Sequence, residues 1–96
     1  MGKKPLMRGD YMFKNIPSLD LHGETRETAR ILIEEFIDDS IKMGNYKVLI
    51  IHGIGSGILR KETHEILRHD SRINKFYIDF FNVGSTVVEI KENIDK

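Results

Sequence analysis

The chain has 96 residues, 15 Lys and Arg against 15 Asp and Glu, 40% hydrophobic residues and no cysteine. This length fits one domain with a modest core, and the missing cysteines exclude disulfides, thiol nucleophiles and Cys-ligated zinc. No apolar run approaches a membrane span and the start lacks the apolar stretch of a signal peptide, so we expect a cytoplasmic protein without a membrane partner. A net charge of zero argues against a protein that coats nucleic acid with its whole surface.

The first elements are a basic segment and a short strand. Residues 1–17 combine Lys and Arg with two prolines and no apolar period, which predicts a flexible basic N-terminal arm. Residues 19–22 alternate apolar and polar side chains, the pattern of a half-buried strand, and Gly23 ends it. On such a strand Asp20 and His22 share one face.

A helix, a buried strand and a second helix follow. Thr25 can cap a helix whose apolar residues recur at helical spacing up to Ile41, and Gly44 supplies the stop. Residues 47–52 form an apolar, β-branched run typical of a central strand. After a glycine-rich loop, residues 59–68 again place apolar side chains on one helical face.

The chain ends in a predicted hairpin. Residues 75–81 and 86–90 alternate as strands, and residues 82–85 carry the Asn, Gly and Ser typical of a turn. Tyr77, Phe80 and Phe81 are of a type that can stack on nucleobases, but on alternating strands such residues belong more often to the core. The order β-α-β-α-β-β predicts an α+β fold, a two-layer sandwich with a mixed four-stranded sheet.

The loop after the second predicted strand reads His-Gly-Ile-Gly-Ser-Gly over residues 52–57. Alternate glycines let a backbone approach a ligand closely, and the following helix start offers free N–H groups to an anion such as phosphate. A tight strand-to-helix turn is the alternative, but three glycines exceed what such a turn needs. The loop matches neither the dinucleotide fingerprint nor a Walker loop.

Asp20 and His22 suit acid–base chemistry, because a carboxylate can orient an imidazole and stabilise its charged form. In isolation, a polar outer face of an edge strand would explain them as well. His52 ends the neighbouring predicted strand. If the two strands are adjacent and parallel, all three side chains meet the glycine loop at the sheet edge where α/β units bind ligands.

A basic stripe follows the glycine loop along the second helix. Arg60 is a candidate for holding a phosphodiester and stabilising the charge that develops on attack. We therefore expect catalysis by Asp20, His22, His52 and Arg60. We expect phosphate or nucleic-acid binding by Gly53, Gly55, Ser56, Gly57, Arg60, Lys61, His64 and Arg68. No metal site is predicted, because His64 and His69 are five residues apart, about 140° around a helix instead of on one face.

Three stretches, residues 19–23, 52–60 and 84–88, resemble the small MutS-related (Smr) domain family in order and spacing. The resemblance covers about residues 18–91 as one Smr domain, leaving residues 92–96 as a C-terminal tail. It implies a fold like the C-terminal domain of translation initiation factor three. The chain looks like a stand-alone Smr protein, since no ATPase or coiled-coil region precedes these motifs. The turn at residues 82–86 has one glycine where the family usually has three, which weakens a phosphate role for that turn.

The resemblance implies an endonuclease that nicks DNA or cleaves RNA, with all four candidate catalytic residues at family positions. On RNA, His22 oriented by Asp20 would take the 2′-hydroxyl proton, and no cofactor is required. On DNA the same pair would hold Mg or Mn. We expect a monomer whose partner is nucleic acid, with the ribosome or repair proteins as further partners. Two alternatives stay open: a non-catalytic nucleic-acid-binding or docking module, and a small-molecule enzyme using the loop for a nucleotide phosphate.

The balanced charge hides an uneven distribution. Residues 44–77 hold six basic and three acidic residues, whereas residues 24–43 hold three basic and six acidic ones. The more basic region carries the candidate site, so neutrality leaves room for a protein that binds phosphate at one edge.

Overall fold

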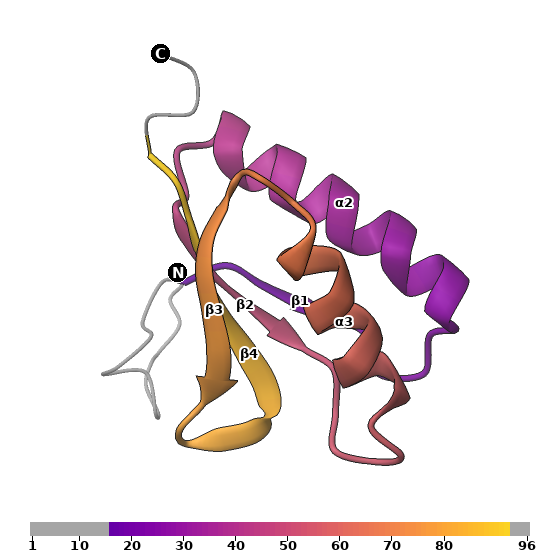
Figure 1. The fold of residues 1–96 in the computed structure, drawn as a ribbon. Coiled ribbons are helices and arrows are strands. Elements are labelled where there is room, and N and C mark those ends of the chain that lie inside the picture. The colour runs from indigo at the N-terminus through magenta and orange to yellow at the C-terminus, as the bar shows by residue number, and fades with distance from the viewer. Residues whose placement is uncertain (1–15, 93–96) are drawn as a thin grey trace, which may run out of the picture.

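The protein is described by a computed structural model that covers residues 16–92 (Figure 1). The predicted N-terminal arm and C-terminal tail therefore lie almost entirely outside the described residues. Within residues 16–92, neither helix is long and apolar enough to cross a membrane.

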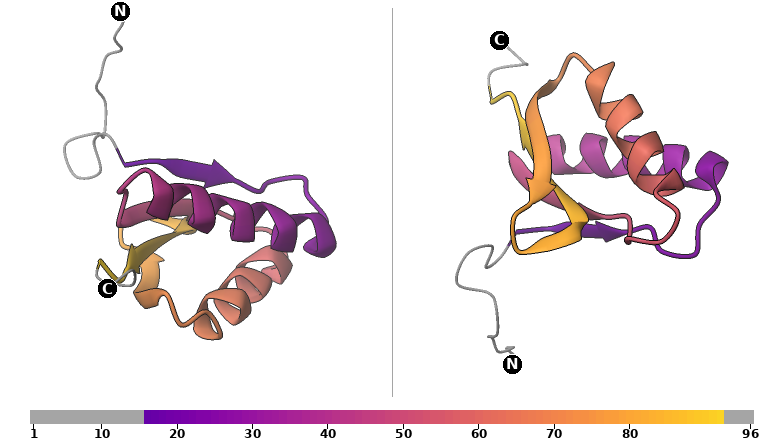
Figure 2. Two further views of the ribbon diagram at one scale, coloured as in Figure 1. Left: turned by 90° about the horizontal axis from the view of Figure 1, so that it is seen from above. Right: turned by 60° about the horizontal axis from the view of Figure 1, so that its bottom comes forward.

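The described chain forms six elements in the predicted order. They are β1 (Ser18–Asp20), α2 (Arg26–Lys42), β2 (Lys47–Ile51), α3 (Ile58–Arg68), β3 (Ile73–Asp79) and β4 (Asn82–Ile90). The strands form one sheet in the order β1-β2-β4-β3, with β1 parallel to β2 and β4 antiparallel to both of its neighbours. Both helices lie on the same face of the sheet (Figures 1 and 2). The predicted two-layer α+β sandwich with a mixed sheet is confirmed.

Strand direction decides where ligands can bind. Since β4 is antiparallel to both β2 and β3, the strands β1, β2 and β3 all run the same way. The segments that follow these three strands therefore meet at one edge of the sheet. In α/β units this is the edge where ligands bind.

The core lies between the sheet and the two helices. Thr25 caps α2 as predicted, its side-chain oxygen accepting the N–H of Thr28 at 3.1 Å. The buried cluster that holds the layers together consists of Leu21, Ala29, Ile33, Ile37, Val48, Ile50, Ile66, Leu67, Ile73, Val88 and Ile90. Burial of each large aliphatic side chain contributes about 1.5–3 kcal/mol.

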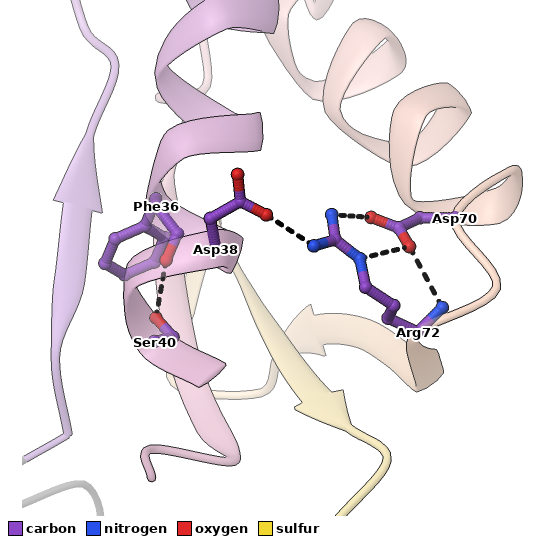
Figure 3. A network of polar contacts seen from close by, with 5 residues as sticks. All are labelled: Phe36, Asp38, Ser40, Asp70 and Arg72. Carbon is purple, nitrogen blue, oxygen red and sulfur yellow. Dashed lines mark hydrogen bonds and ion pairs between the residues drawn. The ribbon is translucent and has the colours of Figure 1, made fainter. Parts of the chain in front are cut away.

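An ion-pair network fixes the entry to β3. The guanidinium of Arg72 donates to Asp70 at 2.8 and 3.0 Å and also to Asp38 on α2 (Figure 3). The Arg72 hydrogen bonds lower the pKa of the Asp70 carboxyl, and the two carboxylates raise the pKa of Arg72. The network ties the end of α3 and the start of β3 to α2 at the side of the molecule away from the glycine loop.

The hairpin differs from the prediction. The turn is not at residues 82–85: Asp79 pairs with Asn82, so Phe80 and Phe81 form a two-residue turn. Residues 83–85 instead form an irregularity within β4, because Ile78 already pairs with Thr86. Asn82 and Gly84 belong to this irregularity and not to the turn. Their composition is typical of a turn, which explains the wrong prediction.

The expectation that Tyr77, Phe80 and Phe81 belong to the core is wrong, because all three side chains are exposed. Phe80 is 88% and Phe81 65% exposed, and their positions in the turn put them outside the sheet. Tyr77 is also partly exposed, and its hydroxyl donates to Glu89 at 3.2 Å.

Candidate functional site

Asp20 and His22 form a pair at the end of β1. Asp20 Oδ1 accepts the backbone N–H of His22 at 3.0 Å and lies 3.3 Å from its Nδ1. The hydrogen bond from the His22 backbone lowers the pKa of the Asp20 carboxyl, with a smaller effect from the ring. Both side chains are open to solvent, 56% and 82% exposed, so an ionised carboxylate holds an accessible imidazole.

The glycine loop is held in place by β4. The carbonyl of Gly84 accepts the N–H groups of both His52 and Gly53 at 2.9 Å. A Cβ on Gly84 would lie 3.3 Å from the Cα and carbonyl carbon of Gly53, so the close approach of the two segments requires glycine there. The irregularity of β4 thus sets the position of the loop.

The end of the loop leaves the start of α3 open. Gly57 caps the helix with φ +85°, a left-handed conformation that favours glycine, and provides no side-chain cap. Ser56 Oγ accepts the N–H of Ile58 at 3.3 Å, and the first turn carries no acidic residue. The next two N–H groups of a helix have no intrahelical partner, so this end can bind an anion.

The basic residues of α3 surround this helix start. An open depression of about 450 Å³ is lined by Ser56, Gly57, Arg60, Lys61, His64, Glu65 and Arg68. The guanidinium of Arg60 lies over the Cα of Gly57, where a Cβ would be 3.2 Å from it. Arg68 is paired with Glu65 at 2.8 Å, whereas Arg60 and Lys61 make no ion pair among residues 16–92. Two uncompensated cations therefore remain beside the open amides.

His52 lies beneath the loop with both ring nitrogens bonded. It is 5% exposed, its Nδ1 lies 3.0 Å from the carbonyl of Gly53, and its Nε2 lies 2.8 Å from Thr86 Oγ1. His64 Nε2 lies 2.8 Å from the same hydroxyl, and its ring packs on Phe76. His52 is thus placed to hold the loop, and its nitrogens are occupied by protein groups.

Burial is the main cause that lowers the pKa of both imidazoles. For His52 the cation of Arg60 adds to this effect, and the bond to Gly53 opposes it. For His64 the further causes are His52, Arg60 and Arg68. Both rings are therefore neutral near pH 7.

The candidate residues fall into two groups on one edge of the sheet. Asp20 pairs with Ile51, the residue before His52, so the two backbones are about 5 Å apart. Asp20 and Ile51 point to the face opposite the helices, whereas His52 and Arg60 lie on the helix side. No hydrogen bond or ion pair joins the Asp20–His22 pair to the His52 group within the described part of the chain.

A groove of about 390 Å³ lies at this edge of the sheet. It runs between the start of α2 and the glycine loop and is lined by Glu24, Thr25, Arg26, His52, Ile54, Gly55, Ser56, Gly57, Ile58 and Leu59. The expected meeting of the β1 and β2 ends is therefore present at the level of the backbone.

Sequence reasoning missed the role of Thr86. Its side chain is fully buried and bonds two histidines. The available signal was the alternation of the strand: Thr86 shares a face with Val88 and Ile90, and a hydroxyl on a core-facing position needs a hydrogen-bond partner.

Comparison with known proteins identifies the domain. The sequence model of the Smr domain matches residues 19–91. The chain is 42% identical over 74 residues to a protein named endonuclease MutS2 from Geobacillus sp. (strain WCH70), covering 77% of this chain and 9% of that protein. The corresponding protein of Symbiobacterium thermophilum is 38% identical over 79 residues, covering 79% and 10%. The chain thus spans about a tenth of the length of these curated relatives.

Two solved structures of Smr proteins have the same fold as this chain. The crystal structure of the Smr domain of Thermus thermophilus MutS2 superposes with a TM-score of 0.77 at 28% identity, covering 79% of this chain and 99% of that one. YdaL, a stand-alone small MutS-related protein from Escherichia coli, shares the fold with a TM-score of 0.76 at 22% identity, covering 95% and 81%. The chain belongs to the Smr domain family.

Proposed function

We propose that this protein is an endonuclease that cleaves phosphodiester bonds of nucleic acid. The observation that carries the proposal is the Asp20–His22 pair, set on the same sheet edge as an open helix start flanked by Arg60. The first group supplies acid–base chemistry and the second an anion site, which together are what phosphodiester cleavage needs. The name of the MutS2 relatives, endonuclease, supports the same function.

On RNA the proposed cleavage uses groups of the protein and needs no metal ion. Asp20 accepts the Nδ1 proton of His22, which leaves Nε2 free to take the proton of a 2′-hydroxyl. The 2′-oxygen attacks phosphorus, the bond to the 5′-oxygen breaks, and that oxygen takes up a proton from water, while His22 keeps the 2′-hydroxyl proton until it is released to solvent. Arg60 and the open amides of α3 stabilise the charge on phosphorus. The products are a cyclic phosphate and a 5′-hydroxyl.

On DNA the missing 2′-hydroxyl requires an activated water, for which Mg or Mn is the usual source. Residues 16–92 contain no group of three or more His, Asp or Glu side chains placed to hold a metal ion. Asp20 and His22 would supply two donors, and water and the substrate phosphate would complete the shell. The two routes therefore differ in their need for metal.

Cleavage of end-labelled RNA and DNA of equal sequence, with and without EDTA, tests the proposal. We expect RNA cleavage that persists in EDTA and leaves a cyclic phosphate. The double variant Asp20→Ala, His22→Ala should lose at least about a hundredfold in rate, the scale of general base catalysis. His69→Ala, which removes another exposed imidazole, is the matched control. A wild-type rate from the double variant contradicts the proposal.

The second candidate function is a binding module that docks nucleic acid, a ribosome or a repair partner without cleaving it. It is favoured by the unpaired Arg60 and Lys61 in an open depression, which suit binding as well as catalysis. Binding that weakens steeply with salt, without turnover on RNA, single-stranded DNA or branched DNA, would support it. We expect a monomer and a single phosphate-binding edge in either case.

A further inference from the structure

Two phenylalanines at the tip of the β3–β4 hairpin have no role in the fold. Phe80 is 88% and Phe81 65% exposed, and their rings meet edge to face with centroids 5.3 Å apart. Two-residue hairpin turns normally use Asn and Gly, whose backbones fit the turn. Exposing two large aromatic rings at turn positions gains nothing for packing, so the explanation lies outside the core.

Side-chain hydrogen bonds hold the backbone of the hairpin turn. The carboxylate of Asp79, itself buried, accepts the N–H of Phe81 at 2.9 Å. On the other strand, Asn82 Oδ1 accepts the N–H of Gly84 at 3.0 Å. The backbone that carries the two rings is thus braced from both sides and needs little ordering when a ligand binds.

The tip lies at the same end of the molecule as the proposed phosphate site. Because β2 and β3 run the same way, the glycine loop and the Phe80–Phe81 turn follow them at the same end of the molecule (Figure 1). The bond from Gly53 to the carbonyl of Gly84 joins loop and hairpin directly. Val83 on the hairpin and Ile54 on the glycine loop are exposed apolar side chains as well.

We propose that an unpaired nucleobase of a strand whose phosphate is held at the glycine loop stacks on Phe80 and Phe81. The proposal rests on the proposed function and names its substrate class: single-stranded nucleic acid. Bases stack on aromatic rings regardless of sequence, because every base has a π face, but a base inside a duplex has both faces covered. Neutral rings and unpaired cations at one end of the molecule suit the alternation of base and phosphate along a single strand.

Fluorescence anisotropy with the full chain tests this inference. The probes are a short labelled single-stranded oligouridylate and an oligonucleotide of equal length in which abasic residues keep the phosphates and remove the bases. We expect the double variant Phe80→Ala, Phe81→Ala to bind the base-bearing probe about tenfold or more weakly, the scale of base–aromatic stacking. Its affinity for the abasic probe should equal that of the wild type.

Three controls make the result specific. Met43→Ala removes a similarly exposed apolar side chain just beyond the C-terminal end of α2, at the opposite end of the molecule, and should leave both affinities unchanged (Figure 1). Phe80→Trp in place of the double variant should retain tight binding of the base-bearing probe. Arg60→Ala should weaken both probes equally, since it removes a phosphate contact and no stacking surface.

The outcomes separate this inference from the proposed function. If the wild type binds both probes and the double variant matches it on both, stacking is overturned while the phosphate site stands. Equal losses on both probes also overturn it. If the wild type binds neither probe, the proposed function fails together with this inference.

Discussion

His52 and His64 meet edge to face, with ring centroids 5.8 Å apart and planes at 89°, and one hydroxyl joins them. The partners fix the direction of the hydrogen bonds. His52 Nδ1 faces a carbonyl, which only accepts, so this nitrogen carries the proton and Nε2 accepts from the Thr86 hydroxyl. The hydroxyl has one proton, so it accepts the second bond from His64 Nε2–H. The neutral rings are thus opposite tautomers.

Nitrogen NMR of the imidazole rings checks this assignment. At pH 7.5 we expect the Nδ1–H tautomer for His52 and the Nε2–H tautomer for His64. Thr86→Val removes the hydroxyl that enforces the difference, and His64 should then populate both tautomers. Finding both rings in the same tautomer in the wild type would contradict the chain of bonds.

The Thr86 hydroxyl also contributes to stability. Thr86→Val keeps the shape of the side chain but leaves two imidazole nitrogens without a partner, so the free energy of unfolding should fall by about 1–3 kcal/mol. Urea unfolding measures the change.

Thr63→Val is the matched control. Thr63 is also fully buried, but its Oγ1 has no hydrogen-bond partner among residues 16–92. Removing that hydroxyl should leave stability unchanged or raise it by up to about 1 kcal/mol. Equal losses from both substitutions would show that the two bonds to Thr86 contribute nothing.

Stability should depend on pH through the same two histidines. Burial lowers the pKa of His52 and of His64 below the ordinary histidine value of 6.5, so the unfolded chain binds these protons first as the pH falls. The free energy of unfolding should therefore be highest above pH 6.5, decrease below it, and level off beneath the folded pKa values. Urea unfolding between neutral and mildly acidic pH follows this decrease.

Two variants test whether the buried histidines cause the fall in the free energy of unfolding at mildly acidic pH. His64→Asn removes one of them and should make the decrease smaller. His22→Asn changes an exposed ring, 82% open to solvent, and should leave the decrease in place. A decrease that is unaffected by His64→Asn and reduced by His22→Asn would reverse the assignment.

The sequence predicted the fold because local signals agreed with packing. The Thr25 cap, the helical period up to Ile41 and the apolar run of β2 each depend on neighbours in sequence, and the structure has all three. The hairpin was predicted wrongly in its turn, since residues 82–85 owe their composition to the approach of Gly84 to Gly53. A contact between residues so far apart leaves no local pattern.

The sequence predicted which residues lie at the candidate site but not the hydrogen bonds that join them. Two strands that run parallel bring Asp20 beside the residue before His52, as topology required. The hydrogen bond between His52 Nε2 and Thr86 depends on the register of β4 against β2, which pairs Thr86 with Ile50. Pairing between strands far apart in the sequence sets this register, so the bonds to Thr86 could not be derived from spacing.

Two glycines of the site should differ in how their substitution affects stability. A Cβ at Gly84 would press on the Gly53 backbone at 3.3 Å, which a neighbouring chain segment cannot easily relieve. We expect Gly84→Ala to lower the free energy of unfolding by about 1–3 kcal/mol, the usual cost of overpacking, as measured by urea unfolding. Nucleic-acid binding should weaken as well, because the loop is displaced.

Substitution of Gly55 tests a role in ligand binding, whereas substitution of Gly84 tests a role in the fold. A Cβ there meets no atom within 4 Å, and its φ lies outside the left-handed region, so Gly55→Ala should change stability by no more than about 0.5 kcal/mol. If this open space is where a phosphate approaches the backbone, the same variant should bind a single-stranded oligonucleotide several-fold more weakly while folding normally. Unchanged binding by Gly55→Ala would place the phosphate elsewhere, on Arg60 and Lys61 further along α3.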